Sequence, residues 1–116
     1  MSTTNPQLRS LIEELKKAAA MQQAPIWKRI AQDLDRPSRQ RRAVNISRIN
    51  TYSKDEDTVV VPGKVLSVGE LDHKVTIAAF SFSGSAKDKI NKVGAALSIK
   101  ELMMKHPKGE KVKIIG

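Results

Sequence analysis

Apolar residues recur at intervals of three and four positions in the first third of the chain, a spacing typical of helices. These intervals predict two helices, one over residues 5–21 and a shorter one over residues 25–36. Asn5 and Pro6 favour the first start, because Asn caps unpaired amides and Pro loses no hydrogen bond at the first helical position. Trp27 lies near the apolar stripe of the second helix, so we expect it in the core rather than stacked on a nucleobase.

β-Branched residues dominate the middle of the chain. A run of valines before Pro62 and Gly63 predicts a strand over residues 58–66 that is kinked or bulged at this dipeptide. The acidic run before it, residues 55–57, is interpreted as an exposed turn because it lacks the spaced ligands and glycine of a calcium loop. The predicted order from residue 44 is strand 44–46, a turn or short helix capped by Ser47 over 47–52, strand 58–66, strand 75–82, a helix from Ser85 to Gly94, a short strand, a helix over 98–107 and strand 111–115.

A helix start preceded by small polar residues is the first candidate for binding chemistry. This start lies at Ser85, directly after the strand predicted over residues 75–82. The unpaired backbone amides at the start of a helix attract anions. Two interpretations stay open: the segment contacts a phosphate, or Ser85 and the acid three positions later merely cap the helix. A capping box is also predicted for Ser98 and Glu101. The candidate anion site comprises Lys64, Ser83, Gly84, Ser85 and Lys87.

Charge gives the strongest indication of function. The 116 residues carry 21 basic and 12 acidic side chains, a net charge of +9 with a pI near 10.0, as expected of a chain that binds polyanions. All arginines fall within the first 50 residues. Guanidinium groups match phosphate oxygens, so this part predicts an RNA-facing segment, and a solvated basic loop is the alternative. The arginines that occur without an intervening acid are Arg36, Arg39, Arg41, Arg42 and Arg48.

Other classes of function find little support in the residues. The chain has no cysteine, so it forms no disulfide or thiolate site, which fits a reducing cytosol. It has no apolar signal segment and no run long enough to span a membrane, so we expect a soluble protein that is not secreted. His73 and His106 lack a neighbouring carboxylate motif and are expected at the surface, which argues against an enzyme. The four aromatic residues are too few for a base-stacking sheet.

Short motifs occur in a fixed order along essentially the whole chain. They are Asn5-Pro6, Ala24–Trp27, the arginine run into Val44–Ser47, Val59–Leu66, Phe82–Ala86, Pro107–Gly109 and Val112–Gly116. Together they resemble the L18e family of archaeal large-subunit ribosomal proteins. Single motifs are weakly specific, whereas their joint presence and spacing are highly specific.

The resemblance implies a fold shared with bacterial ribosomal protein L15, an irregular α/β winding of strand-strand-helix units with an N-terminal helical arm. We expect a helical, arginine-rich arm over residues 1–43 and a compact core over residues 44–116. The resemblance also implies a structural role in the cytoplasmic large ribosomal subunit, in contact with large-subunit ribosomal RNA and neighbouring proteins. It implies no catalysis, cofactor, metal, small-molecule substrate or membrane. An extra-ribosomal RNA chaperone or a small RNA-acting enzyme is the alternative.

Overall fold

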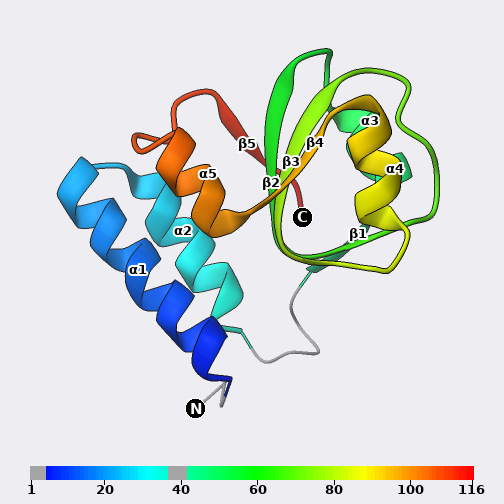
Figure 1. Ribbon diagram of the computed structural model, residues 1–116. Coiled ribbons are helices and arrows are strands. Elements are labelled where there is room, and N and C mark those ends of the chain that lie inside the picture. Colours follow the sequence, from blue (N-terminus) through cyan, green and yellow to red (C-terminus); the bar gives the residue numbers. More distant parts are fainter. Residues whose placement is uncertain (1–4, 37–41) are drawn as a thin grey trace.

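A parallel β-sheet lies between two helical layers in the computed structural model, which describes residues 5–36 and 42–116 (Figure 1). Helices α1, α2 and α5 cover one face of the sheet, and α3 and α4 cover the other. The predicted α/β class with helices at the N-terminal end is confirmed. The elements are α1 (Pro6–Gln22), α2 (Pro25–Leu34), β1 (Arg42–Asn45), α3 (Ile46–Tyr52), β2 (Asp57–Leu66), β3 (Val75–Phe82), α4 (Ala86–Val93), β4 (Ala95–Ser98), α5 (Ile99–Lys105) and β5 (Val112–Ile114).

Strand β2 is the centre of the sheet, because it pairs with three other strands. β3 pairs with it along most of its length, β5 pairs with its first half and β1 with its second half. β4 lies beyond β3, and all of these pairings are parallel. The register between β2 and β3 shifts between Val61 and Lys64, where Pro62 has no N–H to donate. This shift confirms the predicted irregularity at Pro62 and Gly63.

Neighbouring residues of β2 face opposite helical layers. Val60 packs with the layer of α1, α2 and α5, whereas Val59 and Val61 pack with the layer of α3 and α4. Trp27 of α2 is fully buried, and its Nε1–H donates to the carbonyl oxygen of Pro107 at 2.7 Å. The predicted place of Trp27 in the core is confirmed, and its hydrogen bond joins α2 to the loop after α5.

Two helix starts with strong polar signals form as predicted. Asn5 Oδ1 accepts hydrogen bonds from the backbone N–H groups of Gln7 and Leu8, at 2.9 and 3.3 Å. At the start of α5, the Ser98 hydroxyl accepts from the N–H of Glu101, and the Glu101 carboxylate accepts from the N–H of Ser98. All of these partners lie within three residues of each other, so the local sequence contains the whole signal.

The strand predicted over residues 44–46 is displaced toward the N-terminus. β1 spans Arg42–Asn45, and Ile46 already begins α3 with a buried side chain. The predicted cap at Ser47 is therefore wrong, because Ser47 lies within the first helical turn. Pairing with β2 fixes the position of β1, and the residues around position 44 do not reveal that distant partner. The predicted boundary after residue 43 falls inside β1, and the division into arm and core stays a prediction.

Candidate nucleic-acid interface

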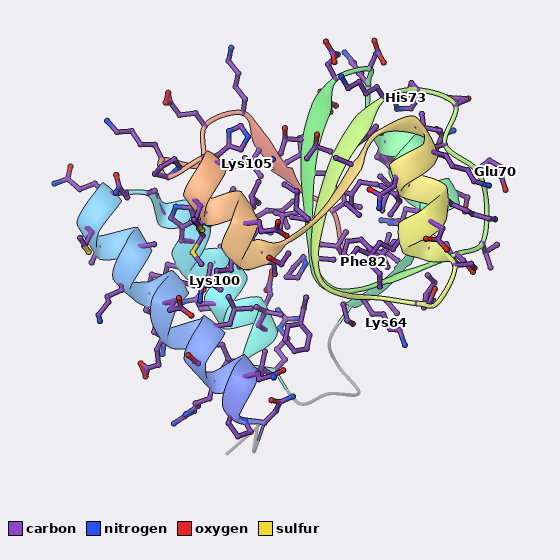
Figure 2. All side chains as sticks on the ribbon, in the orientation of Figure 1. Lys64, Glu70, His73, Phe82, Lys100 and Lys105 are labelled. Atoms are coloured by element: carbon purple, nitrogen blue, oxygen red, sulfur yellow. The ribbon has the colours of Figure 1, made fainter. Side chains whose placement is uncertain are left out.

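The carboxyl ends of β1, β2 and β3 lie at one edge of the sheet, since the three strands are parallel neighbours. Ligands of open α/β sheets commonly bind outside this edge. Figure 2 shows Lys64 and Phe82 near each other at this edge, and α4 begins four residues after Phe82. We call this region the carboxyl edge. It comprises Asn45, Lys64, Ser83, Gly84, Ser85 and Lys87.

Lys64 is an exposed residue in the central strand. Its register partners are Ala43 in β1 and Ser81 in β3, both of them small. Within residues 5–36 and 42–116, the Lys64 ammonium forms no ion pair with a carboxylate. The structure thus leaves the charge of this lysine available to an anion.

The Ser85 hydroxyl does not cap α4, contrary to the prediction. Its backbone has helical dihedral angles, with φ −94° and ψ −8°, whereas a capping serine needs an extended backbone. The amides of Lys87 and Asp88 in the first turn have no hydrogen-bond acceptor in the described part of the chain. Uncapped amides of this kind are potential donors to an anion.

Open surface and unpaired polar atoms meet at the carboxyl edge. A Cβ atom added to Gly84 would have no heavy atom within 4 Å, so the space beside this glycine is open. Ser83 Oγ and Asn45 Oδ1 are buried without a hydrogen-bond partner among the described residues. They flank β2, because Asn45 is the register partner of Leu66 and the N–H of Ser83 donates to the carbonyl oxygen of Val65. Buried polar atoms usually have partners, so these two mark an incomplete polar environment.

Of the five predicted arginines, the structure describes the side chains of two, Arg36 and Arg48. The Arg36 guanidinium lies 3.7 Å from the carboxylate of an aspartate one turn earlier. Arg39 and Arg41 lie outside the described residues, and for Arg42 the structure describes only the backbone, in β1. Arg48 lies on α3. The structure therefore brings Lys64, Ser83, Gly84, Ser85 and Lys87 to one edge, and the grouping of the five arginines stays a prediction.

An arginine–tyrosine pair on α3 was not predicted from the sequence. The guanidinium carbon of Arg48 lies 5.0 Å from the centroid of the Tyr52 ring, within the range of a cation–π interaction. The two residues are four positions apart, which places them on the same face of a helix. This spacing was the signal that could have revealed the pair.

A hydrogen-bonded carboxylate orients one histidine, contrary to the prediction. Asp72 Oδ1 lies 2.7 Å from His73 Nδ1, and Ser53 Oγ lies 2.9 Å from His73 Nε2. The His73 side chain is 18% exposed, so it reaches the surface but is largely covered. The hydrogen bond to His73 is the main cause that lowers the pKa of Asp72. Because Asp72 directly precedes His73 in the sequence, the adjacent acid was the signal that was missed.

This arrangement resembles the acid–histidine–serine order of hydrolases, but the hydroxyl is poorly placed for catalysis. Ser53 is buried, and its hydroxyl donates to the carbonyl oxygen of Ile49 at 2.6 Å. A hydroxyl engaged in this way is not accessible to a substrate. The side chains of Ser53, Asp72 and His73 instead tie the end of α3 to the loop before β3.

Sites of other kinds find no basis in residues 5–36 and 42–116. Among these residues, no group of three or more histidine, cysteine, aspartate or glutamate side chains is placed to hold a metal ion. None of their helices combines the length and apolar character needed to cross a membrane. A groove of about 800 Å³ between α1 and α2 is lined partly by lysine and alanine side chains and contains none of the predicted site residues.

The whole chain, residues 1–116, matches the family described as ribosomal protein 60S L18 and 50S L18e. The large ribosomal subunit protein eL18 of Methanothermobacter thermautotrophicus is 46% identical over 116 residues, which cover 99% of this chain and 96% of that protein. The protein of the same name from Haloarcula marismortui is 45% identical over 115 residues, or 99% of either chain. The one from Sulfurisphaera tokodaii is 55% identical over 92 residues, which cover 79% of this chain and 75% of that protein.

Proposed function

Because this chain belongs to the family of ribosomal proteins 60S L18 and 50S L18e, we propose that it is a structural constituent of the large ribosomal subunit. The observation that carries the proposal is the 46% identity, over nearly the full length of both chains, with a protein named for that subunit. The chain then acts within cytoplasmic ribosomes, where neighbouring ribosomal proteins and large-subunit ribosomal RNA surround it. Its role is to support the assembly and not to catalyse a reaction.

We further propose that large-subunit ribosomal RNA contacts the carboxyl edge and the arginine-rich segment. The net charge of +9 supports a polyanionic ligand. The arginines of this proposed contact are Arg36, Arg39, Arg41, Arg42 and Arg48. At the carboxyl edge, the proposed donors are the ammonium groups of Lys64 and Lys87 and the uncapped amides in the first turn of α4.

The ion pairs of the lysines are compatible with this choice. Several lysines are held by carboxylates, namely Lys74, Lys89, Lys100 and Lys113. Lys64 and Lys87 belong to the larger group of described lysines that form no ion pair with a carboxylate, and both are exposed. Lys87 also lies beside Asp88 in the first turn of α4, where its positive charge offsets the repulsion between that acid and a phosphate. The two lysines therefore keep the carboxyl edge attractive to RNA.

Sedimentation tests the ribosomal role directly. The protein should co-sediment with the large subunit in a sucrose gradient and remain bound in moderate salt. The affinity of the purified chain for transcribed large-subunit RNA should fall with salt, with a log–log slope of about −0.7 to −0.9 for each phosphate neutralised. Absence from the subunit, or an affinity independent of salt, would contradict the proposal.

A small RNA-acting enzyme is an alternative to a structural ribosomal protein. It would need an accessible nucleophile or acid–base pair, and the one oriented histidine contacts a serine hydroxyl that is buried and already hydrogen-bonded. No observation favours an extra-ribosomal RNA chaperone over the ribosomal role. Multiple turnover of RNA by the purified protein would restore the enzymatic alternative.

A further inference from the structure

Tyr52 is the exposed aromatic residue of the described chain, with 59% of its surface accessible. The other aromatic side chains are more covered: Trp27 is fully buried, and Phe80 and Phe82 are partly buried against the two core clusters. The Tyr52 hydroxyl makes no hydrogen bond within residues 5–36 and 42–116. The Tyr52 ring therefore contributes little to the packing of the core.

Arg48 holds the ring from one side. Its guanidinium carbon lies over the ring at 5.0 Å from the centroid, and the two side chains lie one helical turn apart on α3. Arg48 forms no ion pair with a carboxylate in the described part of the chain. The pair thus combines an accessible aromatic surface with a cation that no acid neutralises.

The helix that carries the pair is firmly attached to the protein. Ile46 and Ile49 of α3 are fully buried in the core. The N–H of Ser47 donates to the carbonyl oxygen of Val68 at 3.1 Å, and Ser53 follows α3 and bonds back to Ile49. A side-chain pair on such a support is pre-organised, so a ligand pays little entropy to order it.

We propose that Arg48 and Tyr52 form a stacking site for one unpaired nucleobase of RNA. RNA-binding proteins commonly stack unpaired bases on tyrosine rings and arginine side chains. The inference rests on the proposed binding of large-subunit RNA and adds the chemical group that meets α3.

Neighbouring charge favours a base over a phosphate at this site. Asn50 on α3 accepts a hydrogen bond from the N–H of Asp72 at 3.0 Å, which brings the exposed carboxylate of Asp72 close to the helix. Asp55 follows Tyr52 by three residues and is also exposed. These carboxylates offset the cations of Arg48 and Lys54, which is also exposed, and they disfavour a phosphate but not an uncharged base. Tyr52 therefore meets the base, and Arg48 supplies the cation beside it.

The test compares Tyr52→Leu with Tyr52→Phe in the full chain, with transcribed large-subunit RNA as the probe. Tyr52→Leu should weaken binding by about tenfold, because it removes the aromatic surface. Tyr52→Phe keeps that surface and should bind like the wild type. Neither change alters charge, so the slope of log affinity against log salt should be the same for all three proteins. Arg48→Gln should instead make the slope shallower by up to the value of one phosphate contact.

Each result decides between stacking and another role. Wild-type affinity of Tyr52→Leu, or equal losses in both tyrosine variants, overturns the stacking site. In either tyrosine variant, a loss accompanied by a changed salt slope also overturns it and indicates that the tyrosine supports a phosphate contact. Thermal unfolding midpoints equal to that of the wild type should accompany the binding data, since the ring is exposed. If the wild-type protein itself does not bind the RNA, the proposed function fails, which is a distinguishable outcome.

Discussion

Replacing Gly84 by alanine tests the carboxyl edge with a single methyl group. No heavy atom of the described protein lies within 4 Å of the added carbon, and Gly84 does not have the positive φ that disfavours alanine. The free energy of unfolding should therefore stay the same or rise by up to about 1 kcal/mol, because alanine restricts the unfolded chain. Thermal or urea unfolding measures this part of the prediction.

The expected loss is in RNA affinity. A hydrogen bond between a backbone amide and a charged phosphate contributes about 1.5–3 kcal/mol. If the methyl group of Gly84→Ala holds one phosphate away from the first turn of α4, the affinity for large-subunit RNA should fall by about 10- to 100-fold. The charge of the protein does not change, so this loss arises from the geometry of the contact. Filter binding of the variant and the wild type measures it.

Gly94 provides the matched control at the other end of α4. A Cβ atom added there would overlap the backbone carbonyl group of Val75, which lies in a central strand of the sheet. Gly94→Ala should therefore cost about 3 kcal/mol of stability, or roughly 10 °C in Tm. Unchanged RNA affinity of Gly84→Ala would refute the contact at the carboxyl edge. A stability loss in Gly84→Ala as large as that in Gly94→Ala would show that Gly84 serves the fold.

Three further outcomes are expected. Changing Arg39, Arg41 and Arg42 together to alanine should reduce incorporation into the large subunit in sedimentation and leave Tm nearly unchanged; a large fall in Tm would make these residues structural. Trp27→Phe removes a 2.7 Å hydrogen bond and part of a buried ring, so it should cost about 2–3 kcal/mol in urea unfolding. A hydrogen bond from a lysine of β5 lowers the pKa of Asp57 in the folded protein. The ionised Asp57 carboxylate therefore stabilises the fold above its unfolded-state pKa, and this stabilisation disappears as the pH falls through the lower pKa of the folded state. Asp57→Asn should make unfolding midpoints less dependent on acidic pH, and an unchanged pH profile would contradict this.

The sequence predicts those elements whose signals are local. The start of α1 follows from Asn5 and the proline after it, and the start of α5 follows from Ser98 and Glu101. The irregularity in β2 follows from Pro62, because proline lacks the donor that the sheet requires. In each case the residues that determine the structure are neighbours in the chain.

Features that depend on residues far apart in the chain could not be predicted from the sequence. β1 takes its position from pairing with β2, about 20 residues later. Ser53 meets His73 only after the chain folds, so the histidine network was missed even though Asp72 adjoins His73. Ser85 differs from these two. Serine is a common capping residue, but the turn after β3 gives Ser85 helical dihedral angles, and its side chain does not cap α4. Residue preference could not reveal that backbone geometry.

The change of environment along β2 explains how one strand serves both the core and the carboxyl edge. Its first half is buried on both faces, with Val59 against one helical layer and Val60 against the other. After the register shift, Val65 is still buried against α3 and α4, whereas the neighbouring Lys64 is exposed. The layer of α1, α2 and α5 therefore leaves Lys64 uncovered. The Lys64 side chain displaces no apolar side chain from the core, because no helix of the described chain covers it. The central strand can therefore carry a cation at the edge proposed for RNA without weakening the core.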